Sequence, residues 1–397
     1  MSKIKTQSTT AKATADKQNG WREVKLGDVA TFQRGFDLPT KNRTTGTYPL
    51  MVSNGQDGTH SEYKVEAPGV VTGRSGTLGQ VFFVKKNFWP LNTTLWVKDF
   101  HGNIPQFIYY FLKTLSLEYY NAGSGVPTLN RNHIHPLLVK VPPLPEQKAI
   151  AEVLSSLDEK IDLLHRQNKT LENMAQALFR KWFVEEAQED WEDVKLGDFV
   201  QTTSGYNHKK EEIVDKGGIL LSMGSVVKNY GFSLAASRTI NTNSIDDKYF
   251  CYPADIFVTT RDVTQNAELL GSPGIIPSYF INSKIVLGSN LYKLDVISDL
   301  INKNYLLELL KSDRYREYVK GSASGTSVLM FKKSDLINFK FHLPPKTYLT
   351  KNISFIGELH QKLDKNYSQI HTLENMRDTL LPKLMSGVVR VKFNNET

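Results

Sequence analysis

The chain has 397 residues, of which 40% are hydrophobic and 11% aromatic, a composition typical of a folded protein of about two to four domains. Its single cysteine, Cys251, excludes an internal disulfide framework and cysteine-built zinc sites, and we expect a cytoplasmic location. No run of about 18 apolar residues predicts a membrane span, and no apolar N-terminal segment predicts a secretory signal. The net charge of +8 permits an anionic partner without proving one.

The sequence contains an internal repeat. Residues 21–28 recur as residues 191–198, and residues 171–174 recur as residues 373–376, with the intervening elements in the same order. We therefore divide the chain into five segments: a disordered basic tail (1–20), a first globular domain (21–145), a first spacer helix (146–190), a second globular domain (191–345), and a second spacer helix with a C-terminal tail (346–397). Two divergent copies predict two similar but non-identical recognition surfaces.

The first globular domain is predicted to be mixed α/β. A helix is predicted over 105–120, because Phe107, Phe111 and Leu115 fall on one helical face. Short β-rich runs bounded by Gly and Pro residues predict strands at 70–72, 79–84, 94–97 and 137–141.

The second globular domain repeats these elements with longer insertions. A strand is predicted at 256–258, and a helix over 303–320 matches the first helix, with Tyr305 aligned to Phe107. The copies are 170 residues apart at their first tryptophans and 202 apart at their Pro-Pro pairs, so the second domain is about 32 residues longer in its middle. Such a pattern is expected when two domains share one architecture and recognise different targets.

Apolar residues in the two spacer helices alternate four and three residues apart, which is the heptad spacing of a coiled coil. The predicted seam residues are Leu154, Leu157, Ile161, Leu164, Asn168, Leu171 and Leu178 in the first helix, and Ile356, Leu359, Leu363, Asn366, Ile370, Leu373 and Leu380 in the second. Polar residues in a seam commonly fix its register. We predict that the helices pair antiparallel and hold the domains apart with pseudo-twofold symmetry. The alternative is that each helix only caps the core of its own domain.

Catalytic motifs are missing from the sequence. It has no phosphate-binding loop, no dinucleotide fingerprint, and no Pro-Pro pair in the setting that an adenine methyltransferase motif needs. Residues 158–160 resemble nuclease carboxylates but lie on a spacer helix, where charges usually form a solvated face. His133 and His135 lack a third ligand at useful spacing. We therefore expect no catalytic residue, metal or cofactor in this chain.

Basic and polar loops remain as candidates for binding DNA. Arg74 is the sharpest, because an arginine between glycines after a strand can reach a phosphate or the edge of guanine. Arg261 follows its strand in the second copy as Arg74 does in the first, and residues 131–133 match 332–334. The full set of candidates is Lys41, Asn42, Arg43, Arg74, Ser75, Thr77, Arg131, Asn132, His133, Tyr206, Asn207, Lys209, Lys210, Arg261, Lys332 and Lys333.

Together these features resemble the specificity subunits of type I restriction–modification systems. The resemblance is carried by the paired starts at 21–28 and 191–198, the Gly-Arg-Ser-Gly-Thr-Leu-Gly loop at 73–79, the opening of the spacer helix at 141–147, and the segments at 177–183 and 381–387. No one motif is decisive, but their order and duplication are highly specific.

This resemblance implies an α+β fold in which two target-recognition domains each read one half of a bipartite, asymmetric sequence in double-stranded DNA. It implies that the antiparallel coiled coil sets the gap between the half-sites and docks two modification subunits, which bring S-adenosylmethionine and methylate adenine. Restriction subunits that use ATP and Mg²⁺ would join this core and cleave unmodified DNA. The chain itself would be non-catalytic.

Two other hypotheses remain open from the residues alone. A duplicated coiled-coil scaffold would bind proteins and no nucleic acid, and a stand-alone nuclease would cleave DNA with an unrecognised site. Retardation of a DNA duplex by the assembled complex separates the first hypothesis from DNA recognition. Metal-dependent cleavage by the isolated chain would favour the second.

Overall fold

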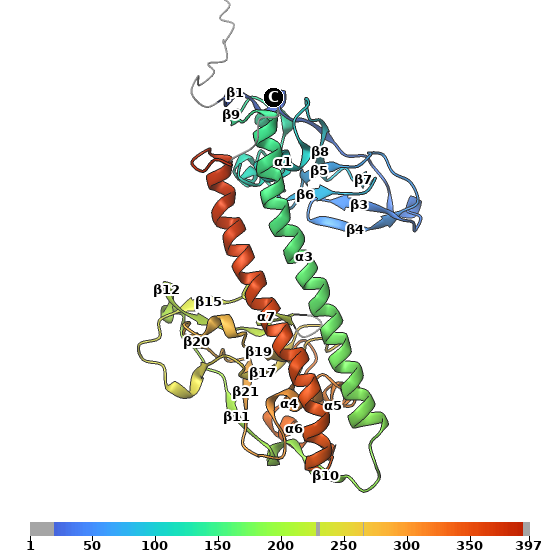
Figure 1. Ribbon diagram of the computed structural model, residues 1–397, viewed down its shortest axis with the longest axis vertical. Coiled ribbons are helices and arrows are strands. Elements are labelled where there is room, and N and C mark those ends of the chain that lie inside the picture. Colours follow the sequence, from blue (N-terminus) through green and yellow to red (C-terminus); the bar gives the residue numbers. More distant parts are fainter. Residues whose placement is uncertain (1–19, 228–230, 265, 392–397) are drawn as a thin grey trace, which may run out of the picture. The chain divides into compact units, whose positions relative to one another are not determined.

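The computed structural model describes residues 20–227, 231–264 and 266–391 (Figure 1). The tail predicted at 1–20 lies outside these residues except for Gly20. Contacts divide the chain into two compact units, residues 1–160 with 373–397, and residues 161–372. The long helices α3 (Leu144–Arg180) and α7 (Lys346–Met385) each contribute a segment to both units.

The first unit is built around a four-stranded antiparallel sheet. Its strand order is β2 (Thr31–Arg34), β8 (Thr94–Asp99), β5 (Gly69–Gly73) and β6 (Val81–Val84). A second sheet has the order β4 (Gly55–His60), β3 (Tyr48–Val52) and β7 (Trp89–Pro90), and β1 (Arg22–Lys25) pairs with β9 (Leu138–Val141). The four strands predicted in this domain are confirmed, with β6 beginning later than predicted.

The helix predicted over 105–120 is shorter in the structure. Helix α1 (Pro105–Lys113) ends before Ser116, which adopts a left-handed conformation with φ of 47°, and a short 3-10 helix follows at Leu117–Tyr120. The apolar face of α1 packs into the core of the unit, where Phe107 and Phe111 are buried together with Leu154 of α3 and Leu384 of α7.

The second unit has the same frame with additional strands. Its counterpart sheet has the order β11 (Val200–Ser204), β21 (Leu291–Val296), β17 (Ile256–Thr259) and β19 (Pro273–Ile275), and β10 (Glu192–Lys195) pairs with β23 (Lys340–Leu343). A further sheet has the order β15 (Arg238–Ile240), β12 (Ile213–Leu220), β20 (Ile285–Val286) and β16 (Phe250–Cys251). Two short ribbons pair β13 (Val226–Val227) with β14 (Gly231–Phe232), and β18 (Arg261–Asp262) with β22 (Leu329–Met330).

The single helix predicted over 303–320 is wrong, because the structure has two helices there. Helix α4 (Lys303–Leu309) is followed by α5 (Asp313–Ser322). Ser312 starts α5 as its N-cap, since its hydroxyl accepts a hydrogen bond from the amide of Tyr315. Asp313 in the first turn favours the same start, because a negative charge is stabilising near a helix N-terminus.

Segments of α3 and α7 contact each other in each unit. In the first unit Asp158 of α3 bonds to Arg377 of α7 at 3.0 Å, and in the second unit Asn168 of α3 bonds to Asn366 of α7 at 2.8 Å. Within the second unit, the carbonyl of Trp182, just after α3, also accepts a hydrogen bond from Tyr348 of α7 at 3.1 Å. The partners on α7 thus fall from 366 to 348 as residue numbers rise from 168 to 182, so the paired segments run antiparallel. All fourteen predicted seam residues are buried or half-buried.

The helices also close the domain cores, as the alternative interpretation expected. Leu154 and Leu384 belong to the core of the first unit, and Ala175 and Ile356 belong to that of the second. Helix pairing and core capping therefore occur together in each unit.

Each unit has a polar contact between its domain helix and a long helix, but the chemistry differs. Tyr110 of α1 donates a hydrogen bond to Asp158 of α3 at 2.6 Å. At the aligned positions of the second unit, Glu308 of α4 lies 2.9 Å from Nε2 of His360 of α7. The acid thus lies on the long helix in the first unit and on the domain helix in the second. In the part of the chain that the structure describes, no helix combines the length and apolarity that a membrane span requires.

Candidate nucleic-acid interface

Matching backbone hydrogen bonds identify equivalent positions in the two domains. The amide of Leu129 donates to the carbonyl of Arg74 at 2.8 Å, and the amide of Phe331 donates to the carbonyl of Thr260 at 2.9 Å. Leu129 and Phe331 each lie two residues before a short helix, α2 (Arg131–Ile134) and α6 (Lys333–Asn338). Thr260 is therefore the structural counterpart of Arg74.

The prediction that Arg261 corresponds to Arg74 is wrong by one residue. Ser75 forms a β-bridge with Thr128, and Arg261 pairs with Met330 in the same way between β18 and β22. Arg261 thus occupies the position of Ser75. Because successive side chains of extended chain point to opposite faces, this shift directs the arginine to the other side of the backbone.

Arg74 lies in a small cluster of charged and polar groups. Its Nε donates to the carbonyl of Asn92 at 2.8 Å, and burial and the nearby charge of Arg34 lower the pKa of its guanidinium, partly offset by Asp37. Arg34 itself lies 3.4 Å from Asp37 and keeps about half of its side chain exposed (52%). The cluster therefore presents two guanidinium groups with one carboxylate between them.

Arg34 was missed in the sequence because it is the last residue of β2 and no glycine-rich loop marks it. Its position becomes informative only once the strand order places β2 and the turn after β7 together. Ser75 is half-buried and Thr77 is exposed in the same loop as Arg74. These residues surround the loop that the sequence marked most strongly.

Arg131 and Lys333 are equivalent and both hold the edge of a sheet. Arg131 donates from Nη1 to the carbonyl of Phe32 at 3.5 Å, and Lys333 donates from Nζ to the carbonyl of Thr202 at 2.7 Å. The predicted match of 131–133 with 332–334 is therefore wrong by one residue. Of the neighbouring candidates, Asn132, His133 and Lys332 are exposed.

The candidates at 41–43 lie on a different loop. Lys41 and Asn42 are exposed on a 3-10 helix, Thr40–Asn42, while Arg43 pairs with Asp57 at 3.2 Å. Among the described contacts, none joins this loop to the Arg74 cluster. The structure does not bring these two sets of candidates together.

The loop after β11 carries the candidates of the second domain. The Tyr206 hydroxyl donates to Glu212 at 2.5 Å, which raises the pKa of Tyr206 and lowers that of Glu212. The amide of Lys209 donates to the same carboxylate at 2.6 Å, so the loop is closed around it. Asn207, Lys209 and Lys210 are exposed.

Asp262 supports the loop that follows Arg261. This carboxylate is buried and accepts hydrogen bonds from the amides of Thr264, Leu269 and Leu270 at 2.7, 2.6 and 3.2 Å. Burial alone would raise the pKa of Asp262, but these donors outweigh it and lower the pKa. No motif in the sequence predicts this structural role of Asp262.

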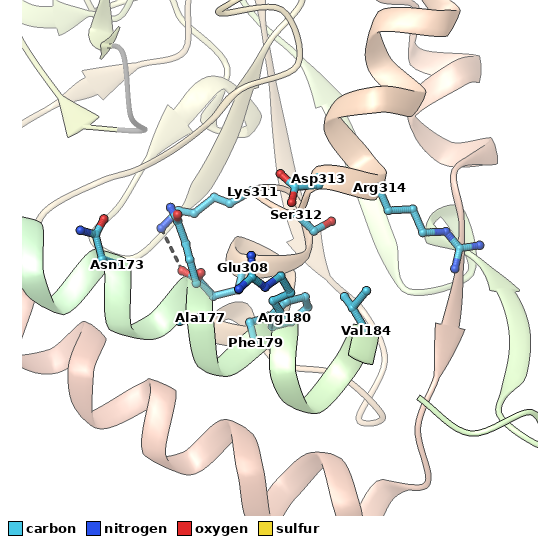
Figure 2. A pocket seen from close by; sticks show the side chains of 11 residues that line it. Asn173, Ala177, Phe179, Arg180, Val184, Glu308, Lys311, Ser312, Asp313 and Arg314 are labelled. Carbon is cyan, nitrogen blue, oxygen red and sulfur yellow. Dashed lines mark hydrogen bonds and ion pairs between the residues drawn. The ribbon is translucent and has the colours of Figure 1, made fainter. Parts of the chain in front are cut away.

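A charged pocket lies elsewhere in the second unit. Its volume is about 390 Å³, and it is lined by residues of α3 and of the connection from α4 to α5. Figure 2 shows these side chains, among them Glu308 and Lys311, which form an ion pair at 2.9 Å. Burial would raise the pKa of Glu308, but Lys311 and His360 outweigh it and lower the pKa. No predicted DNA-binding residue is among the described residues that line this pocket. Of its charged residues, Glu308 of α4 contacts His360 of α7 at 2.9 Å.

The duplicated frame and its basic loops match one protein family. The model of the type I restriction modification DNA specificity domain matches the chain twice, over residues 18–173 and 188–373. These matches cover most of the sequence, and the chain belongs to this family of type I specificity subunits. The resemblance identified from the sequence is thereby confirmed.

Two relatives and one solved structure support this assignment. The MjaIX specificity subunit of Methanocaldococcus jannaschii is 28% identical over 319 residues, covering 73% of this chain and 70% of that protein. The MjaVIII specificity subunit of the same organism is 24% identical over 413 residues, covering 94% of each chain. The crystal structure of the S subunit of a type I restriction–modification system from M. genitalium has a TM-score of 0.61 at 19% identity, covering 97% of this chain and 99% of that one. The predicted fold class is confirmed.

Proposed function

We propose that this chain is the non-catalytic DNA-reading subunit of a type I restriction–modification complex. The domain at 21–145 would read one half of a bipartite sequence and the domain at 191–345 the other half. One observation carries the proposal: the same backbone hydrogen bonds frame both loops, yet Arg74 in one domain is replaced by Thr260 in the other. A shared frame with different side chains suits two modules that read different bases.

The helices α3 and α7 would set the gap between the half-sites. Their antiparallel segments in each unit and the buried pair of Asn168 and Asn366 support a fixed register. Two modification subunits would dock mainly on these helices. They would supply S-adenosylmethionine and methylate adenine, and restriction subunits would add ATP- and Mg²⁺-dependent cleavage of unmodified DNA.

The test uses the chain alone and assembled with its modification subunits. We expect the chain alone to bind DNA weakly and with strong salt dependence, and the assembly to retard duplexes in a sequence-dependent manner. Sequencing of methylated adenines after incubation should give a single bipartite motif.

Methylation or cleavage by the chain alone would contradict a non-catalytic role. If the assembly retards no duplex in moderate salt, a protein-binding scaffold explains the fold better. Inserting about one heptad in α3 should change the gap and leave both half-sites unchanged. Altered half-sites would contradict the role of the helices in spacing.

A further inference from the structure

A second cavity lies in the second unit, beside the sheet of β15, β12, β20 and β16, and residues of β12 and β15 line it. Its volume is about 320 Å³, within the usual range of ligand pockets. Polar groups on its walls come from four separate segments: His208 after β11, Ser222 after β12, Arg238 on β15, and Ser289 with Asn290 before β21. None of these five residues was selected as a DNA-binding candidate from the sequence.

Close approach of the backbone at two glycines shapes the walls of this cavity. A Cβ atom on Gly288 would lie 2.1 Å from the carbonyl oxygen of Leu221, and one on Gly224 would lie 2.4 Å from the Cβ of Ala236. The Ser222 hydroxyl also donates to the carbonyl of Ala236 at 3.0 Å.

The turn at 288–290 corresponds to the turn at 91–93 of the first domain. Tyr206 forms a parallel β-bridge with Gly288, as Phe36 does with Leu91. The amides that follow agree as well: Thr260 donates to the carbonyl of Asn290 at 3.0 Å, and Arg74 donates to that of Thr93 at 2.8 Å. The two turns hold the same place in the frame.

The two turns differ in what covers them. In the first domain the Arg74 side chain lies against its turn, with Nε bonded to the carbonyl of Asn92. In the second domain the equivalent residue is Thr260, whose short side chain has no guanidinium. The cavity opens beside the turn in this domain, and a different arginine, Arg238, lines it.

Arg238 lies on β15, which pairs antiparallel with β12 as β4 pairs with β3 in the first domain. It is exposed, it pairs with Leu220 across β15 and β12, and no described residue forms an ion pair with its guanidinium. No carboxylate is among the described residues that line the cavity, and Nδ1 of His208 is buried there without a described hydrogen-bond partner. The site is therefore positively charged and has unused hydrogen-bonding capacity.

We propose that this cavity reads a base pair of the second half-site, with Arg238 as the specificity-determining residue. The proposal rests on the DNA-reading function proposed above. The Arg238 fork matches O6 and N7 of a guanine edge, and the amide of Asn290 and the hydroxyl of Ser222 are suited to neighbouring base edges. Arg238 thus supplies from β15 the charge that Arg74 supplies in the first domain.

The test compares variants of the full chain, assembled with modification subunits, on a library of randomised DNA duplexes. Arg238→Ala should reduce the preference for the correct base at one position of the second half-site by about 5- to 150-fold, and leave the first half-site unchanged. Arg74→Ala should do the reverse. Arg238→Lys, which keeps the charge but loses the fork, should resemble Arg238→Ala. Equal thermal midpoints would show that the variants fold.

Three results would overturn the proposal. A uniform loss of binding to all sequences, or full rescue by Arg238→Lys, would make Arg238 a phosphate contact. If Arg238→Ala reads both half-sites normally while Arg74→Ala relaxes the first, the cavity does not read DNA although the chain does. If the wild-type assembly shows no sequence preference, the DNA-reading function itself fails.

Discussion

The buried pair of Asn168 and Asn366 makes a quantitative prediction about stability. The side chains are 3% and 1% exposed, and Nδ2 of Asn366 donates to Oδ1 of Asn168 at 2.8 Å. Replacing either residue by leucine leaves the other with an unsatisfied polar group in the helix interface, which costs about 1–3 kcal/mol. Replacing both by leucine removes both polar groups, which is expected to be neutral or stabilising.

The assay is urea unfolding of the two single variants and the double variant, followed by helical circular dichroism. We expect each single variant to be less stable than wild type, and the double variant to be more stable than either single variant by about 1–3 kcal/mol. Asn173→Leu is the matched control, because Asn173 is exposed on the same helix, and its effect should stay within about 0.5 kcal/mol. The double variant should also lose register specificity, seen as more than one gap length among bound sites.

Additive effects would refute this reasoning. If the double variant loses about the sum of the two single losses, the asparagines do not act as a pair. If the double variant is more stable and still selects one gap length, the pair is not needed to fix the register.

Three further predictions concern buried groups. Asp262→Ala should reduce the free energy of unfolding by at least about 2 kcal/mol, because three amides lose a charged acceptor, and a loss below about 0.5 kcal/mol in urea unfolding would contradict this. Since the folded pKa of Glu308 is lowered, its stabilisation is complete above its ordinary value of 4.5 and is lost as the pH falls through the folded value. Glu308→Gln should therefore lose less stability than wild type as the pH falls below about 4.5. Thermal midpoints that fall equally with pH in the two proteins would contradict this. Burial raises the pKa of Cys251 to about 12, so a thiol reagent at pH 8 should label it only after unfolding, and rapid labelling of the folded chain would show that the thiol is accessible.

The long helices could be predicted from the sequence because a heptad repeat is local and periodic. Asn168 and Asn366 stood out at seam positions, but their mutual hydrogen bond could not be predicted without the pairing register. The break between α4 and α5 had a local signal in Ser312 and Asp313, a serine N-cap followed by an acidic residue. The apolar pattern that runs through this break outweighed it in the prediction.

The loop assignments failed for a different reason. Arg261 was aligned to Arg74 because each follows a predicted strand, whereas its true position depends on a strand pairing with Met330, far away in the sequence. The cavity beside Arg238 depends on contacts between segments near 222, 238 and 289. Such contacts follow from the whole fold, and no short window of sequence contains them.

The reversed chemistry where each domain meets its long helix constrains how such proteins exchange modules. Tyr110 donates to Asp158 in one unit, whereas Glu308 faces His360 in the other. A recombinant carrying the second domain on the first helix would set Glu308 against Asp158, so that two carboxylates repel each other where a hydrogen bond stood before. Exchange of a recognition domain, in evolution or by engineering, therefore has to include the long-helix residue that the domain contacts.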